Sequence, residues 1–222
     1  MYKVRGRNMP KNGMVKVCVL AVSVGAPYFE GHKIEAIAHW MKKRLENGTF
    51  EECYVNVCDT ANRHNLSYMG VNDNACELMA QIKGKHWIKR NRKIFDKVGV
   101  PVKFMRWSQW IESKETQLIC AELKELIKKD VSFKEAIHFD VKNYVERQIK
   151  KGKVLTTRRE AYGKAMNCIL EKIAVNTCMG RRFEHIKLYP GTQNKSSKLI
   201  LSGKIDAPYG LHRQHYVKLT ER

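Results

Sequence analysis

A serine at the end of an apolar run is the first residue in this sequence whose position suggests chemistry. Ser23 follows Val15–Val22, a β-branched run typical of a buried strand, and precedes a turn that contains Gly25 and Pro27. A hydroxyl there lies at the end of a sheet, near backbone N–H groups of the turn and of the next helix. The position fits a nucleophile, and it also fits a serine that only caps the turn.

The same turn argues against two nucleotide-binding motifs. A dinucleotide-binding turn needs Gly-x-Gly-x-x-Gly, whereas this one has a single glycine followed by Pro27. The P-loop pattern Gly-x-x-x-x-Gly-Lys-Ser/Thr does not occur in the chain. We therefore do not expect NAD or a P-loop nucleotide to bind at this turn.

A strongly basic stretch lies in the first half of the chain. Ala75–Val98 predicts one long helix that ends at Gly99. Its cations are Lys83, Lys85, Lys89, Arg90, Arg92, Lys93 and Lys97. Such a helix face can bind a nucleic-acid backbone by charge, and Trp87 and Trp110 are candidates for stacking on bases. The alternative is a solvated helix face with both tryptophans in the core.

A late helix carries further candidates. The predicted helix Thr157–Val175 places Asn167 and Glu171 one turn apart, and Cys168 and Lys172 one turn apart beside them. A carboxylate at this place can do acid–base work, although most glutamates on helices only face solvent.

The ends of strands are where chemistry collects in α/β sheets. Tyr189 and Pro190 follow the predicted strand His185–Leu188. Tyr189, Ser23 and the segment after Val57 are therefore the candidates for one shared site.

Strands and helices alternate along the chain. The predicted strands are Val15–Val22, Glu52–Val57, Val102–Trp107 and His185–Leu188. The predicted helices cover about 32–45, 75–98, 114–129, 133–151 and 157–175, and the polar residues Asp59–Asn74 predict a loop. This order predicts right-handed crossovers and a mainly parallel sheet flanked by helices, in a Rossmann-like α/β domain.

The length of the chain indicates one domain, and its net charge indicates the kind of partner. The 222 residues suit one domain, and we expect 1–222 to fold as one, with a loose basic arm over 1–12. Lys and Arg number 42 against 22 Asp and Glu, a formal net charge of +20. A polyanion is the expected partner, and nucleic acid is favoured over membrane because no basic amphipathic terminal segment is present. No run approaches the roughly 18 apolar residues of a membrane span, and we expect a monomer.

The cysteines point to a reducing compartment. Their number is odd, 7, and no Cys-x-x-Cys pair occurs, which argues against a disulfide framework and a structural zinc site. Most lie in apolar runs, where a free cysteine behaves as a small hydrophobe. We expect a cytoplasmic protein without a bound metal.

The serine turn, the basic helix and Tyr189-Pro190 follow one another along the chain as they do in the cyclodipeptide synthases, and the sequence resembles that family. The run VLAVSVGAPYF is similar to the family's strand followed by Ser-x-Gly-x-x-Tyr-Phe, and the resemblance covers about Val15 to Gly191. It implies a fold like the catalytic domain of class I tyrosyl- and tryptophanyl-tRNA synthetases. It also implies an enzyme that joins the aminoacyl groups of two aminoacyl-tRNAs into a cyclic dipeptide, without ATP, cofactor or metal.

The resemblance implies a role for each matched residue. Ser23 is the nucleophile that carries aminoacyl and dipeptidyl groups in a ping-pong reaction, Tyr189 relays a proton during ring closure, and Glu171 handles the amine. The tRNA lies on the basic helix. The expected substrate-binding residues are Val19, Ala21, Val55 and Val57 as pocket walls, Gly25 as oxyanion donor, Ala26 at a variable position of the Tyr-Pro subfamily, and Asn167 beside Glu171.

The late helix departs from the family pattern of a Tyr followed four residues later by a Glu. Anchoring on Glu171 puts Asn167 at the Tyr, whereas a shift by one puts Cys168 and Lys172 there, about 100° around the helix. We prefer the first register because it keeps a carboxylate for an ammonium group. Two other functions stay open: a non-catalytic tRNA- or RNA-binding protein, and a different α/β enzyme such as a serine-dependent acyltransferase or a methyltransferase.

Overall fold

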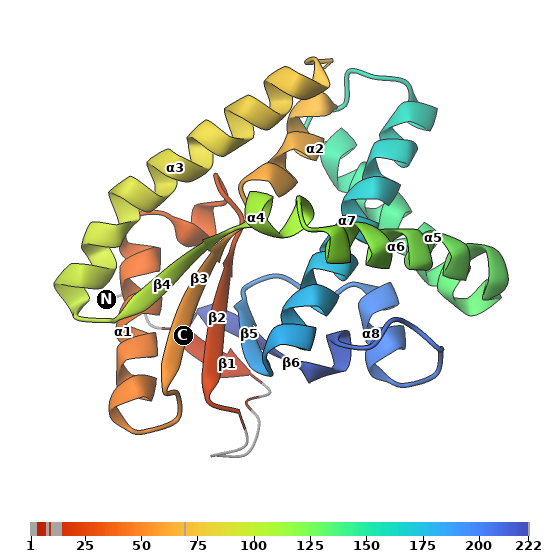
Figure 1. The fold of residues 1–222 in the computed structure, drawn as a ribbon. Coiled ribbons are helices and arrows are strands. Elements are labelled where there is room, and N and C mark those ends of the chain that lie inside the picture. The colour runs from red at the N-terminus through yellow and green to blue at the C-terminus, as the bar shows by residue number, and fades with distance from the viewer. Residues whose placement is uncertain (1–3, 8, 10–14, 69, 222) are drawn as a thin grey trace.

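Six strands form one sheet in the computed structural model, which describes residues 4–7, 9, 15–68 and 70–221 (Figure 1). The spatial order is β1-β6-β5-β2-β3-β4. Their bounds are β1 Val4–Arg7, β2 Val17–Val22, β3 Glu52–Val57, β4 Val102–Arg106, β5 His185–Tyr189 and β6 Gln214–Glu221. Every neighbouring pair is parallel except β1 with β6. The predicted α/β class and mainly parallel sheet are confirmed.

Helices cover both faces of the sheet. On one face α1 (His32–Glu46) and α3 (Asp73–Val98) pack on the apolar side chains of β2, β3 and β5. On the other face lie α4 (Trp107–Ile111), α5 (Lys114–Lys129), α6 (Val131–Lys150), α7 (Arg158–Arg182) and α8 (Lys195–Leu201). Figure 1 shows α3 and α1 on one side of the strands and α5 to α8 on the other. Each face has its own hydrophobic core, as expected for a sheet buried on both sides.

The segment between β3 and α3 is helical, so the predicted loop over Asp59–Asn74 is wrong in its first half. Thr60–Asn62 is a 3-10 turn that leads into α2 (Arg63–Ser67). Asp59 starts it, because its carboxylate accepts the N–H of Thr60 at 2.8 Å. A polar composition can therefore belong to a short helix when a cap begins it and tertiary contacts cover it.

The predicted loose arm over 1–12 is also corrected in part. Residues 4–7 form β1, which pairs antiparallel with β6 along Val4 to Glu221 and Arg7 to Lys218. The rest of the arm, apart from Met9, lies outside the described residues. The partner strand is far away in the sequence, so local composition carries no sign of this pairing.

The last helix before β5 is longer than predicted. α7 runs to Arg182, whereas the pattern predicted an end at Val175. The added residues include Asn176, Thr177 and Gly180, which are poor helix formers, but all three are buried. A Cβ at Gly180 would collide with the carbonyl of Gly210, so only glycine lets the chain cross here.

Candidate active site

Ser23 lies at the carboxyl end of β2, where the chain turns toward α1. Its carbonyl accepts the N–H of Ala26 at 3.1 Å, which closes the turn. Gly25 has φ of 79°, a left-handed conformation that costs a residue with a Cβ about 1–2 kcal/mol. The N–H groups of Val24 and Gly25 donate to no other residue that the structure describes. The turn therefore leaves donors available beside the serine hydroxyl.

Tyr189 reaches Ser23 from the neighbouring strand. The two hydroxyl oxygens lie 3.1 Å apart and share one hydrogen bond. β5 is parallel to β2, so both residues come to the same edge of the sheet. The phenol ring packs against Phe29, with 6.2 Å between ring centroids, and a Cβ at Gly191 would collide with it. The structure thus brings together the two residues that the sequence placed at strand ends.

The four predicted pocket walls do not share a face of the sheet. In the parallel pairing of β2 with β3, Ala21 lies beside Asn56 and Leu20 beside Val55. Side chains alternate along a strand, so Val19 and Ala21 lie on the α7 side, and Val19 belongs to that core. Val55 and Val57 belong to the core under α1 and α3. Including these two valines as walls of the same pocket was wrong.

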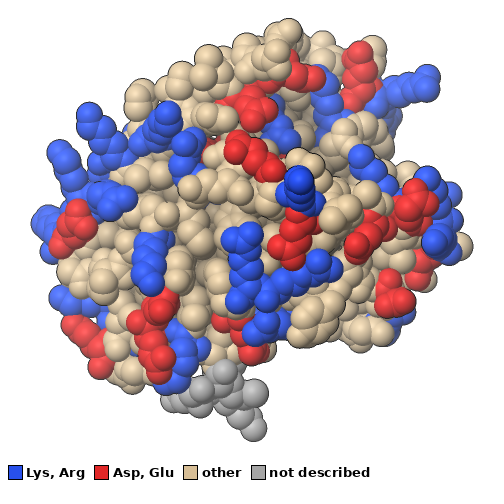
Figure 2. Space-filling model, in the orientation of Figure 1, with Lys and Arg blue, Asp and Glu red and all other residues tan. Residues whose placement is uncertain are grey.

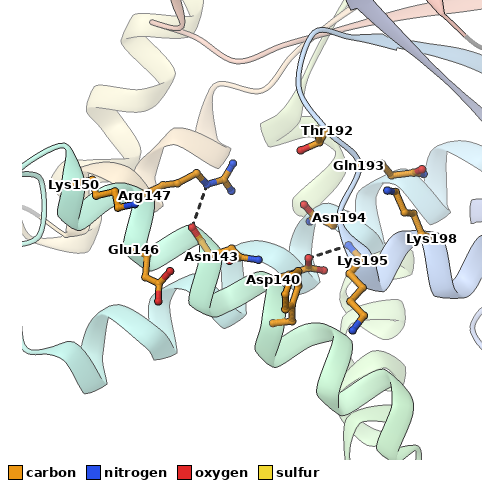
Figure 3. Close-up of a pocket in the computed structure, with 11 residues that line it drawn as sticks. Asp140, Asn143, Glu146, Arg147, Lys150, Thr192, Gln193, Asn194, Lys195 and Lys198 are labelled. Atoms are coloured by element: carbon orange, nitrogen blue, oxygen red, sulfur yellow. Dashed lines mark hydrogen bonds between the residues drawn. The ribbon is translucent and has the colours of Figure 1, made fainter.

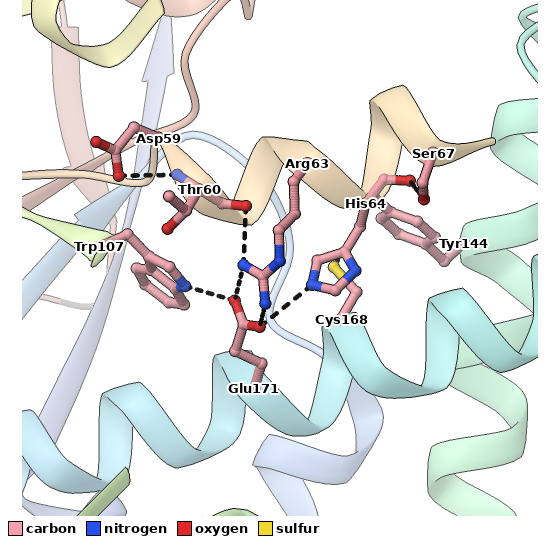
Figure 4. Close-up of polar contacts among 9 residues, drawn as sticks. All are labelled: Asp59, Thr60, Arg63, His64, Ser67, Trp107, Tyr144, Cys168 and Glu171. Carbon is pink, nitrogen blue, oxygen red and sulfur yellow. Dashed lines mark hydrogen bonds and ion pairs between the residues drawn. The ribbon is translucent and has the colours of Figure 1, made fainter. Parts of the chain in front are cut away.

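Glu171 is enclosed by donors (Figure 4). Its Oε1 accepts from Trp107 Nε1 at 2.7 Å and from Arg63 Nη1 at 3.3 Å. Its Oε2 accepts from Arg63 Nη2 and lies 3.2 Å from His64 Nε2. Burial opposes the ionised form, but the hydrogen bond and charge of His64, with Arg63 and Trp107, leave the pKa of Glu171 below its usual value. Four donors fill the roughly four acceptor positions of one carboxylate.

Sequence reasoning missed the residues that hold Glu171. Arg63 and His64 lie in the segment predicted as a loop, and Trp107 ends the predicted third strand. Their only signal was position, because both segments directly follow a strand at its carboxyl end. Asp59 anchors this region: it is fully buried, and it pairs with Arg106, whose Nη2 lies 2.6 Å from Asp59 Oδ2.

Lys172, which belongs to the alternative alignment of α7, faces the sheet. Lys172 interacts electrostatically with the Tyr189 phenol and with the thiols of Cys168 and Cys58. Its ammonium lies 5.0 Å from the centre of the Tyr144 ring. One turn on, the side chain of Asn176 accepts from Lys187 Nζ at 2.8 Å. Lys172, rather than Glu171, is thus the α7 side chain directed toward the Ser23–Tyr189 pair.

Asn167 lies apart from this group. Its side chain is exposed, and in the described part of the chain no hydrogen bond or ion pair joins it to Ser23, Tyr189 or Glu171. Ala26 is partly buried in the turn after Ser23 and packs toward the core under α1 and α3. Of the substrate-binding candidates, Val19, Ala21, Gly25 and Ala26 therefore remain close to Ser23 or on the sheet face that leads to it.

The basic helix is a surface feature. The seven predicted cations of α3 are all exposed, and Figure 2 shows lysine and arginine side chains gathered along this helix. Three of them have partners: Arg90 pairs with Glu30 at 2.5 Å, Lys97 pairs with Glu35 at 3.7 Å, and Arg92 lies over the Phe104 ring. The other four, Lys83, Lys85, Lys89 and Lys93, have neither an ion pair nor a ring contact with a described residue.

Neither tryptophan is placed to stack on bases. Trp87 is 1% exposed, and its indole N–H donates to the Phe29 carbonyl at 3.1 Å. Trp110 is buried in the opposite core, with the Arg182 guanidinium 4.8 Å from its ring. The proposed base-stacking role is wrong, because both rings supply core packing between helix and sheet.

A polar cavity adjoins the segment after Tyr189 (Figure 3). Its volume is about 560 Å³, and it lies between α6 and the residues that lead into α8. Asp140 fixes that segment by accepting the N–H of Lys195 at 2.9 Å and of Ser196 at 2.8 Å. The amide nitrogen of Gln193 is buried without a partner in the described residues. The cations of the lining are Arg147, Lys150, Lys195 and Lys198.

Across 4–7, 9, 15–68 and 70–221, no helix is long and apolar enough to span a bilayer. In the same part of the chain, no group of three His, Cys, Asp or Glu side chains is placed to hold a metal ion.

No protein-family model and no curated protein matches the chain, but solved structures do. A CDPS, or cyclodipeptide synthase, from Fluoribacter dumoffii matches with a TM-score of 0.81 at 20% identity, over 100% of this chain and 99% of that chain. A cyclodipeptide synthase from Candidatus Glomeribacter gigasporarum bound to Phe-tRNAPhe has a TM-score of 0.69 at 18% identity, over 96% and 92%.

A Mycobacterium tuberculosis protein, whose structure relates cyclodipeptide synthetases to type I tRNA synthetases, has a TM-score of 0.66 at 14% identity. That match covers 99% of this chain and 93% of the other. At these identities the likeness concerns the arrangement of strands and helices along nearly the whole chain. The protein has the α/β fold of the cyclodipeptide synthases.

Proposed function

We propose that this protein is a cyclodipeptide synthase that uses two aminoacyl-tRNAs and carries its intermediates on Ser23. The observation that carries the proposal is the hydrogen bond of 3.1 Å between Ser23 and Tyr189 at the carboxyl edge of the sheet. The fold and the exposed lysines of α3 support it, because the substrate is a polyanion that bears an activated ester.

The first half-reaction loads the serine. The Ser23 hydroxyl attacks the ester carbonyl of the first aminoacyl-tRNA, and the terminal ribose hydroxyl leaves with the proton. The aminoacyl group is now an ester of Ser23. The free N–H groups of Val24 and Gly25 are the donors for the oxyanion that forms on the way. The ester is already activated, so the step consumes no ATP.

The second half-reaction makes two peptide bonds. The amine held on Ser23 attacks the ester of a second aminoacyl-tRNA, which leaves a dipeptidyl group on Ser23 and releases the second tRNA. The new free amine then attacks the Ser23 ester, the ring closes, and the serine hydroxyl is restored. Tyr189 relays the proton between the attacking amine and the departing Ser23 oxygen.

Glu171 acts in this proposal as a positioning residue. Its carboxylate is fully occupied by Arg63, His64 and Trp107, so it has no acceptor position left for the substrate amine. It instead fixes α2 and the start of α4 against α7. The amine is then held by other groups at the edge of the sheet, which differs from the role that the resemblance implied for Glu171.

The polar cavity beside α6 is our candidate for the second substrate. It is bounded by the segment directly after Tyr189 and carries four cations, which suit the phosphate-bearing acceptor end of a tRNA. In the double variant Arg147→Gln, Lys195→Gln we expect the aminoacyl enzyme to form normally and dipeptide formation to slow at least tenfold. Equal slowing of both steps would contradict this placement.

The direct test is the product. The full chain is expressed in a bacterium beside its Ser23→Ala variant, and the culture medium is analysed by mass spectrometry. A new diketopiperazine that depends on Ser23 supports the proposal and names both residues. Two soluble proteins with no difference in products contradict it.

A catalytically silent tRNA-binding protein is the second candidate function. Two side chains of α7 favour it. Lys172 is itself a cation, and the Glu171 carboxylate is already occupied, so neither can accept a hydrogen bond from a substrate ammonium group. The same culture, together with a tRNA-binding measurement, separates the two functions: this candidate requires tRNA binding that is equal in wild type and Ser23→Ala, with no product from either.

A further inference from the structure

Two lysines lie on the sheet face next to the candidate nucleophile. Lys187 is on β5, two residues before Tyr189, and it pairs in register with Val19 of β2. Lys172 faces it from α7. Burial raises the pKa of the Cys58 thiol, and the charges of Lys187 and Lys172 oppose that rise. The backbone N–H of Cys58 donates to the carbonyl of Val22, the residue before Ser23, at 2.8 Å. The lysines and the nucleophile therefore belong to one neighbourhood.

This pair lacks a negative partner. Neither Lys172 nor Lys187 forms an ion pair with an Asp or Glu of the described residues, in contrast to Arg63 and Arg106 nearby. Their direct neighbours are the Asn176 amide, the Tyr144 ring and the thiols of Cys58 and Cys168. Burial lowers the pKa of Lys187 to about 8, and the like charge of Lys172 adds to this.

Cations held close together without a counter-ion are costly, and proteins usually pair them. Here two half-buried lysines lie together on the α7 side of the sheet, near the carboxyl ends of β2 and β5. The site is therefore electrostatically incomplete without an anion, and the reaction brings a small group to this place each time Ser23 is loaded.

We propose that Lys172 and Lys187 bind the side-chain carboxylate of an aspartyl or glutamyl group carried on Ser23, so that the first substrate is an acidic aminoacyl-tRNA. This inference rests on the proposed function. Lys187 and Tyr189 are two positions apart, which is about 6.6 Å along the strand. A lysine stem covers that span, so its ammonium reaches the side chain of a residue esterified to Ser23.

A tRNA phosphate is the other anion that could meet these lysines. The exposed lysines of α3 and the cations of the cavity already provide outer surfaces for phosphates. The pair lies instead against the strands, with Lys187 beside Val19, where an aminoacyl side chain would lie. The two anions make different predictions, since a phosphate is common to every tRNA and a carboxylate is particular to two amino acids.

The experiment loads the full-length protein with a mixture of aminoacyl-tRNAs and identifies the Ser23 adduct by intact-protein and peptide mass spectrometry. We expect an aspartyl or glutamyl adduct in the wild type. Lys187→Met keeps an unbranched side chain, one atom shorter, and removes its charge, so we expect at least a tenfold loss of the acidic adduct. Apolar aminoacyl groups then replace it. Lys43→Met, an exposed lysine of α1, is the matched control and leaves the adduct unchanged.

Each failure has its own signature. An apolar adduct on wild-type Ser23 overturns the inference and keeps the proposed function. A loss in Lys187→Met that is equal for every amino acid also overturns it and assigns the lysines to tRNA phosphate. No adduct from any aminoacyl-tRNA, with Ser23→Ala indistinguishable from wild type, overturns the proposed function itself. Circular dichroism of both variants confirms that they are folded.

Discussion

At the scale of residues, the candidate site depends on side chains that come from distant parts of the chain. Ser23 and Tyr189 are 166 positions apart and share a hydrogen bond, and Glu171 is held by residues more than 100 positions away, Arg63 and His64. Each of these side chains lies at or just after a strand end, or on the helix that covers those ends. Parallel strands thus concentrate unrelated segments at one edge of a sheet.

Removing the Tyr189 hydroxyl tests its role in ring closure. In Tyr189→Phe the ring still packs on Phe29, but the hydrogen bond to Ser23 is lost. We expect aminoacyl transfer to Ser23 to persist and ring closure to slow by about 100-fold, which is within the usual contribution of a positioned acid–base group. Intact mass spectrometry will show a dipeptidyl enzyme accumulating. An unchanged rate of product formation would rule out the relay.

His185 gives the protein a pH-dependent stability. Its side chain is fully buried beside Phe183, and burial lowers its pKa to about 4 from an ordinary 6.5. The unfolded chain therefore binds a proton that the folded chain does not, between about pH 6.5 and pH 4. We expect the free energy of unfolding to fall by about 3 kcal/mol from this group as the pH drops through that window.

Denaturant titrations of wild type and His185→Leu at several pH values between 7 and 4 check this. The variant should lose the part of the pH dependence that His185 supplies. His86→Gln removes an exposed histidine of α3 and is the control. Parallel curves for wild type and His185→Leu across the window would show that the buried imidazole makes no contribution.

At the scale of elements, α3 combines two functions on opposite sides. Its inner face places Trp87 and Phe95 in the core against β3 and β4. Gly84 allows close contact with Asp59, since a Cβ there would collide with that side chain. Its outer face presents the unpaired lysines. A helix this firmly packed keeps its charges in a fixed array, which suits a surface that binds a regular phosphate backbone.

Neutralising that outer face should weaken tRNA binding. In the variant with Lys83, Lys85, Lys89 and Lys93 all changed to Gln, we expect at least tenfold weaker binding. The salt dependence should also become shallower, because each lost phosphate contact removes about 0.9 from the slope of log K against log salt. Binding of labelled tRNA at several salt concentrations measures both quantities.

The control carries the same charge change elsewhere. Lys124, Lys129, Lys134 and Lys142 are exposed on α5 and α6, and their quadruple change to Gln also lowers the net charge by four. We expect this variant to bind tRNA nearly as the wild type does. If both variants lose the same affinity and slope, net charge rather than α3 accounts for binding.

At the scale of the whole molecule, the sheet ends in two different edges. β4 is one edge, and it carries Lys103, whose side chain is 68% exposed, and Arg106. β1 is the other, and it closes the sheet by pairing antiparallel with β6. Charged edge residues oppose strand pairing between molecules, and a net charge of +20 adds a general repulsion between copies.

We therefore expect a monomer in solution. Size-exclusion chromatography with light scattering should give a mass near 25.8 kDa at moderate salt. The reason is the combination of charged edge, net charge and two cores already covered by helices. A mass of twice this value that persists over a range of protein concentrations would contradict the prediction.

The sequence by itself determined the class of fold and the positions of the two hydroxyls. Apolar runs such as Val15–Val22 and the alternation with amphipathic helices fix a parallel sheet, and strand ends fix where Ser23 and Tyr189 meet. The cations of α3 were equally visible, because an exposed face is defined by the helix's own periodicity.

Only the tertiary structure decided which side chains face the site. The rotation of α7 is set by its contacts with α2, α4 and the sheet, and it turns Glu171 toward Arg63 and Lys172 toward Tyr189. Neighbouring residues on a helix point about 100° apart, so sequence spacing cannot choose between two adjacent residues that both face packed elements. The face of a strand is likewise fixed by register, which is why Val55 and Val57 lie opposite Val19.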